Sequence, residues 1–132
     1  MPKKYFILDV NHGKSGINAQ LMEIADEACF VKAACELLNC TTLERCEVVL
    51  AGKSVDAWYD GNFLKKDGVD DSCCMIFKSS KGIVRHLFGR ILLAGHQVKA
   101  DINSVPLSSD ELMYSVMSDE VCLGVKGTRV IH

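Results

Sequence analysis

The chain lacks several features that would assign it directly to a functional class. Its 132 residues carry a formal net charge of -2, so there is no surplus of positive charge for a nucleic-acid backbone. No apolar run approaches the length of a membrane span, and no secretory leader is recognised. We therefore expect a cytoplasmic protein that binds neither nucleic acid nor a membrane.

The cysteines lack the spacing of a metal site or a disulfide framework. Seven are present, at positions 29, 35, 40, 46, 73, 74 and 122, and no pair is arranged as Cys-x-x-Cys. Zinc sites and disulfide frameworks show regular spacing or nearby histidines. We expect reduced cysteines that serve as small apolar residues, with no metal and no cofactor.

The sequence also lacks an evident catalytic residue. The adjacent pair Cys73-Cys74 is the strongest candidate for a nucleophile. A reactive thiol needs a cation or a helix N-terminus close to the sulfur, and the sequence places neither there. Catalytic residues stay unassigned, and a role other than catalysis is favoured.

Strand and helix signals alternate along the chain. Apolar, β-rich runs predict strands over residues 5–10, 46–51, 72–78, 97–102 and 121–125. Apolar residues at helical spacing predict helices over 17–38 and 82–94, and a short helix from Ser54 through Trp58 is a further option. Ser108 and Glu111 have capping-box spacing before a helix through Met117.

This order of elements predicts the fold class. The first strand–helix–strand unit is expected to form a right-handed parallel crossover. The whole chain, residues 1–132, is then a single α/β domain. We expect a three-layer sandwich with a mostly parallel sheet of about five strands.

Two loops of this predicted sheet share the tripeptide Gly-Lys-Ser. Ligands of open parallel sheets lie beyond the carboxyl ends of the strands, where loop amides, a helix dipole and a lysine suit an anion. Neither loop is a nucleotide-binding P-loop, because Leu8 and Glu47 stand where the first glycine belongs. The alternative is that these residues only form turns and caps. The predicted ligand-binding residues are His12, Gly13, Lys14, Ser15, Gly52, Lys53 and Ser54.

The chain resembles the DsrE/DsrF-like family, small α/β proteins of sulfur-relay systems. The resemblance lies in the opening strand and glycine turn from Phe6 to Gly16, in Val48 to Gly52, and in the order of elements from Leu87 to Val125. It implies an oligomer of identical or paralogous subunits. Sulfur-carrying members have a cysteine after the fourth strand, whereas the matching residues 100–106 contain none. The resemblance therefore implies a member without the persulfide cysteine.

Four functional hypotheses follow. The first is a DsrE-like oligomeric accessory protein, with a possible place in sulfur relay. The second is a module that binds a small anion or metabolite through the Gly-Lys-Ser loops. The third is an enzyme that uses Cys73 or Cys74, and the fourth is a protein whose role is to bind another protein, as an inhibitor or immunity factor does. The first is preferred because it explains the order of elements as well as the composition.

Overall fold

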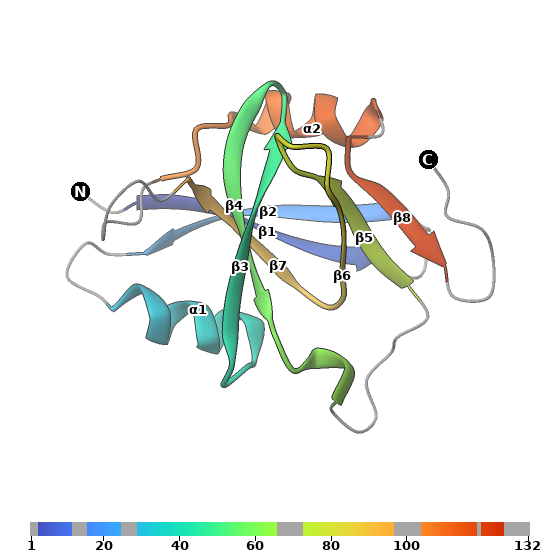
Figure 1. Ribbon diagram of the computed structural model, residues 1–132. Helices are drawn as coiled ribbons and strands as arrows, with labels where there is room; N and C mark the ends of the chain where they lie inside the picture. The colour runs from blue at the N-terminus through green and yellow to red at the C-terminus, as the bar shows by residue number, and fades with distance from the viewer. Residues whose placement is uncertain are drawn as a thin grey trace.

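The computed structural model describes residues 3–11, 16–24, 29–65, 73–96, 104–118 and 120–125. Within these residues every strand pairing is antiparallel. One sheet has five strands in the order β2-β1-β7-β4-β3, and a second has three in the order β6-β5-β8 (Figure 1). The predicted α/β sandwich with a mostly parallel sheet is therefore wrong.

The elements have the following bounds. The larger sheet consists of β1 (Lys3–Asn11), β2 (Gly16–Ile24), β3 (Leu43–Leu50), β4 (Lys53–Asp60) and β7 (Ile91–Gly95). The smaller sheet consists of β5 (Cys73–Lys78), β6 (Val84–Leu87) and β8 (Cys122–Val125). The helices are α1 (Phe30–Leu38) and α2 (Ser109–Met117), with a 3-10 turn η1 (Phe63–Lys65).

The centre of the five-stranded sheet is buried on both faces, because two separate cores lie against it. On one face, side chains such as Phe6 and Val48 pack with Met75 of the smaller sheet and Leu112 of α2. The opposite face packs against α1, whose Ala34 and other apolar residues cover β1, β4 and β7. In Figure 1, α1 lies at the lower left and α2 at the top. This double covering explains why β7 is buried along its whole length.

The predicted helix over 17–38 is wrong in its first part. Residues Gly16–Ile24 form β2, which pairs with β1 along nine positions from Lys3 to Asn11. Of the described residues in this range, only Phe30–Leu38 are helical, as α1. The apolar spacing of Ile17, Leu21 and Ile24 fits a helix, but backbone pairing with β1 decides the conformation.

Two other helix predictions are also wrong. Residues 82–94 contain β6 and β7, and Gly89 between these strands has a φ of 79°, a left-handed conformation that an α-helix does not tolerate in its interior. Gly95, expected to end that helix, is the last residue of β7. Residues Ser54 to Trp58 lie within β4.

Several local predictions are confirmed. The strands predicted over 5–10, 46–51, 72–78 and 121–125 overlap with β1, β3, β5 and β8. The helix α2 begins at the predicted capping box of Ser108 and Glu111. The strand predicted over 97–102 falls outside the described residues. Among the described residues, no helix is long and apolar enough to cross a membrane.

Candidate functional site

The strands that precede the two Gly-Lys-Ser loops are not parallel neighbours in the sheet. His12, Gly13, Lys14 and Ser15 lie outside the described residues. The strands that precede the two loops, β1 and β3, are separated in the sheet by β7 and β4. The predicted arrangement, two parallel neighbours with their ends open to one cleft, is therefore absent.

The second loop is a tight β-hairpin turn. Leu50 pairs with Lys53, and the two residues between them, Ala51 and Gly52, have φ values of 53° and 74°, as a type I′ turn requires. The Lys53 Nζ atom lies 2.9 Å from Oε2 of Glu111. Lys53 also donates a hydrogen bond to the Pro106 carbonyl. The lysine thus joins the hairpin to the start of α2, where its positive charge is neutralised.

A buried carboxylate holds together a different group of polar residues, which we call the Asp56 cluster: Arg45, Asp56 and His96. Asp56 is only 1% exposed. Its Oδ2 lies 2.9 Å from Nη1 of Arg45, and its Oδ1 lies 2.8 Å from Nδ1 of His96. The side chains of Arg45 and His96 are 41% and 45% exposed. The cluster therefore consists of two basic side chains that reach the solvent and one buried carboxylate that holds both in place.

The sheet register explains this arrangement. Asp56 lies in β4 opposite Ala94 of β7, and its side chain is on the same face as that of Trp58, two residues later. A buried carboxylate is expensive unless it is paired, and its two basic partners come from β3 and from the end of β7. The Arg45 guanidinium also lies 5.7 Å from the centre of the Trp58 ring, a cation–π contact.

Glu47 adds a second acidic group near the cluster. It lies opposite Asp56 in the β3–β4 register, accepts a 2.7 Å hydrogen bond from Ser54 Oγ, and accepts two more from Ser80. Burial raises the pKa of Glu47, but the hydrogen bonds from Ser54 and Ser80, together with the nearby His96, bring the pKa below its ordinary value. The predicted residue Ser54 thus belongs to this polar surface.

The chemistry open to the cluster is recognition or proton transfer at His96. Nδ1 of His96 is engaged by Oδ1 of Asp56, so Nε2 is the ring nitrogen left for a ligand. Sequence reasoning missed this cluster. One signal in the sequence could have indicated it: Asp56 is an acidic residue between two apolar neighbours, Val55 and Ala57. Such a residue in a buried strand needs charged or polar partners.

The edge strand β2 is a second candidate. It ends the five-stranded sheet, and the described residues supply no strand on its outer side. Its central residues, 18–21, are all exposed, and Leu21 is 47% exposed. Natural edge strands are usually protected by proline, by lysine or by shortness. The sequence of β2 is nine residues long, has no proline, and carries one charge, at Glu23.

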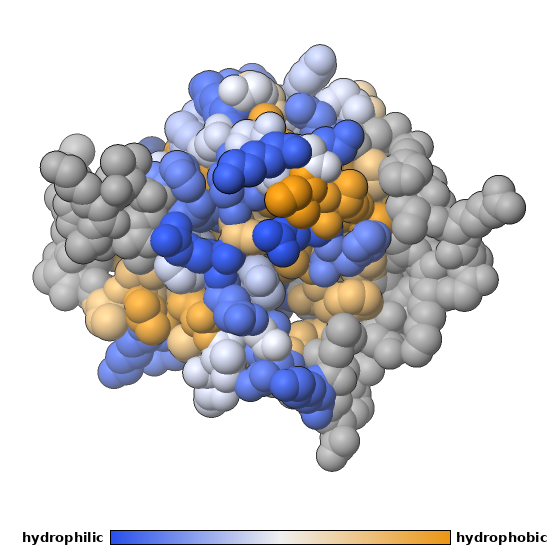
Figure 2. Space-filling view, viewed as in Figure 1, coloured by the Kyte–Doolittle hydropathy of each residue, from blue (hydrophilic) through white to orange (hydrophobic). Residues whose placement is uncertain are grey.

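Other exposed apolar residues are scattered over the surface. Figure 2 shows a face on which hydrophilic residues surround an apolar patch over β6 and another over α1; Ile83 and Val84 are 48% and 47% exposed, and Val31 of α1 is 51% exposed. On α2, Met113, Tyr114 and Met117 are exposed. Single exposed apolar residues are normal, so none of these positions defines an interface by itself.

The proposed cysteine nucleophile gains no support. Cys74 is buried beside Ile76 and Cys122, and the side chain of Cys73 is outside the described part of the structure. A third thiol, Cys46, has a pKa raised by burial, which disfavours the reactive thiolate. Within the described residues, no group of three or more His, Cys, Asp or Glu side chains is arranged to hold a metal ion.

Comparisons with protein-family models, curated proteins and solved structures find no match for this chain. The DsrE/DsrF-like resemblance therefore stays a prediction. The features of the described structure that bear on function are the Asp56 cluster and the edge of β2.

Proposed function

We propose that this protein is a small interaction protein that forms a homodimer through the outer edge of β2. The observation that carries the proposal is a nine-residue edge strand whose centre is exposed on both faces. An open edge presents backbone donors and acceptors to a further strand, and strand addition is a common mode of protein recognition. This proposal retains the oligomeric, non-catalytic part of the sequence-based hypothesis without its parallel sheet.

A second copy fits this edge because the strand is complementary to itself. In an antiparallel pair centred on Gln20, every residue of β2 has a partner. The only charge, Glu23, falls opposite Ile17, so like charges do not meet. Leu21 falls opposite Ala19 of the other copy, which would bury a leucine that is now 47% exposed. A two-fold axis through Gln20 would thus pair the backbones of the two β2 strands along their full length.

Pairing of this kind would join two five-stranded sheets into one continuous ten-stranded sheet, since each sheet ends at β2. We place the assembly in the cytoplasm, where the six cysteines with described side chains would persist as thiols. A role as an accessory subunit, the sulfur-relay role included, is compatible with such a dimer and is not required by it.

The test is the mass in solution as a function of concentration. We expect a dimer by light scattering after size exclusion. Leu21→Lys should weaken the dimer at least tenfold, because each copy would bring a lysine close to the two-fold axis. Leu21 is half-exposed, so this variant is expected to fold.

Val31→Lys is the matched control. Val31 is 51% exposed on α1 and is not part of the β2 edge, so the same change of apolar to charged side chain should leave dimerisation unchanged. A wild-type chain that stays monomeric at the highest attainable concentration would refute the proposal. So would a Leu21→Lys variant that dimerises as tightly as Val31→Lys.

A second candidate function is the binding of a small anion at the Asp56 cluster. The specific observation is that one buried carboxylate fixes two half-exposed basic side chains, Arg45 and His96. Only one guanidinium nitrogen of Arg45 is used in the contact with Asp56, which leaves donors for a ligand. Glu47 on the same surface opposes this function, so the dimer is the preferred proposal.

Thermal shift with inorganic phosphate tests the second candidate. Stabilisation that rises with phosphate concentration and disappears in Arg45→Gln would support it. Lys65→Gln removes an exposed positive charge on η1, outside the Asp56 cluster, and serves as the control. An equal response of the two variants would show that phosphate acts only on general surface charge.

A further inference from the structure

The end of α1 brings two cysteines together although four residues lie between them in sequence. Asn39 adopts the left-handed conformation with φ 52° and ψ 54°. Its N–H donates to the Glu36 carbonyl, and the N–H of Cys40 donates to the Cys35 carbonyl at 2.9 Å. These two bonds define a Schellman motif, in which the first and last residues commonly place their side chains in contact. Here those residues are Cys35 and Cys40.

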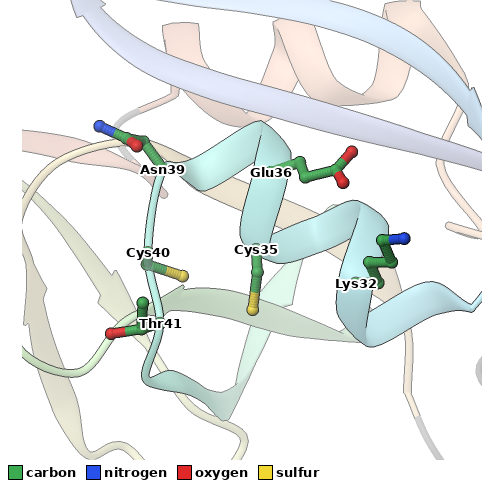
Figure 3. Close-up of a pocket in the computed structure, with 6 residues that line it drawn as sticks. All are labelled: Lys32, Cys35, Glu36, Asn39, Cys40 and Thr41. Carbon is green, nitrogen blue, oxygen red and sulfur yellow. The ribbon is translucent and has the colours of Figure 1, made fainter.

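Both thiols line one open hollow of about 620 Å³. Figure 3 shows the two sulfur atoms directed to the same side of the helix end, whereas the Glu36 carboxylate extends away from them. Cys35 is partly exposed, and Cys40 is buried. A ligand that enters from solvent therefore meets one accessible thiol with a second thiol behind it.

A basic group lies at the same end of the helix. Arg90 donates from Nη1 to the Leu37 carbonyl at 2.9 Å, which offsets the negative end of the helix dipole. Lys32 and Glu36, which have opposite charges, both line the hollow, and in Figure 3 both of their charged ends extend away from the sulfur atoms. A bis-thiolate complex of a monovalent cation carries one net negative charge, and the hydrogen bond from Arg90 reduces the negative dipole charge that would oppose it.

We propose that Cys35 and Cys40 form a two-coordinate binding site for a soft monovalent metal ion, with Cu(I) as the fitting probe. Two thiolates are the ligands that Cu(I) prefers. Binding replaces two S–H bonds by two S–Cu bonds and releases two protons to solvent, and the copper stays in its reduced state. Zinc requires about four ligands, and the described residues offer no group of three.

The first test is an anaerobic competition of the reduced protein with bicinchoninate, a coloured Cu(I) chelator. The wild-type chain is expected to remove one equivalent of Cu(I) from the chelator. Cys35→Ser and Cys40→Ser should each lower the affinity at least a hundredfold, because a hydroxyl is a poor ligand for a soft ion. Cys29→Ser is the control, since it removes an exposed thiol at the opposite end of α1.

The second test uses the unmodified chain and does not depend on the folding of variants. One equivalent of Cu(I) is added, the protein is alkylated with iodoacetamide, and labelled peptides are identified by mass spectrometry. Cys35 is expected to be protected while Cys29 is labelled. The proposal is overturned if Cys35 is labelled equally with and without copper, if Cys29→Ser removes binding, or if the wild-type chain leaves the chelator fully loaded.

Discussion

Nδ1 of His96 lies 2.8 Å from Oδ1 of Asp56, so a half-exposed imidazole at the end of β7 is held by a carboxylate buried within β4. Arg45 of β3 approaches the other oxygen of the same carboxylate. Three neighbouring parts of the sheet are thus joined through a single side chain.

Asp56→Asn should destabilise the fold by about 2 kcal/mol, because it replaces two charge-assisted hydrogen bonds in a buried position. Urea unfolding measures the change. The control is Asp9→Asn, whose ion pair with Arg90 at 3.5 Å is about half-exposed on both sides. Removal of such a surface pair should change stability by about 0.5 kcal/mol or less. Equal losses of stability in the two variants would show that the buried contacts of Asp56 contribute no more than the exposed ion pair of Asp9.

Glu47 should contribute a pH-dependent part of the stability. Its folded pKa lies below the ordinary value of 4.5, so its ionised form stabilises the fold above that value. This contribution is lost as the pH falls through the lowered folded pKa. Urea midpoints from neutral to acidic pH should therefore decline less steeply in Glu47→Gln than in the wild type.

Ser54→Ala provides a second test of the same group. The variant removes the 2.7 Å hydrogen bond to the Glu47 carboxylate and should raise the pKa of Glu47 towards its ordinary value. The carboxyl resonance of Glu47 in an NMR titration reports this directly. A titration curve that is unchanged in Ser54→Ala would show that the hydrogen bond does not lower the pKa.

Ser108→Ala should cost about 1 kcal/mol, because it removes the N-cap of α2. Ser108 Oγ accepts from the Glu111 N–H at 3.1 Å, and Oε1 of Glu111 accepts from the Ser108 N–H at 3.0 Å. Ser109→Ala is the matched control, since Ser109 is exposed in the first turn of the same helix. Thermal unfolding that gives equal shifts for the two serines would contradict the capping role.

Ala51→Asn should stabilise the β3–β4 hairpin by about 0.5 to 1 kcal/mol. Ala51 has a φ of 53°, which is unfavourable for a residue with an ordinary Cβ, and asparagine tolerates it better. Gly52→Ala should have the opposite effect, because the φ of Gly52 is 74°. Urea unfolding of the two variants should therefore shift the midpoint in opposite directions.

Local signals predicted the elements that depend on few residues. The capping box at Ser108 and Glu111 identified the start of α2, and short apolar runs identified β1, β3 and β5. These features act within a few positions of the chain, so the sequence displays them directly. The direction in which strands pair depends on distant residues, and no local pattern encoded it.

The main error concerned residues 17–24, where Ala19, Gln20, Leu21 and Met22 favour a helix intrinsically. As an edge strand exposed on both faces, β2 needs no strict alternation of apolar and polar residues, so the usual strand signal is weak. The Asp56 cluster and the Cys35–Cys40 pair were hidden for a related reason. The first depends on β-sheet register and the second on one left-handed residue, Asn39.

Trp58, the only tryptophan of the chain, lies in the core beneath α1, with its ring centre 5.1 Å from that of Phe30. The core on the opposite face of the sheet contains no indole. Intrinsic fluorescence will therefore follow the detachment of α1, while circular dichroism follows the sheets. If α1 separates before the strands melt, the two optical signals will give different transition curves from a single sample.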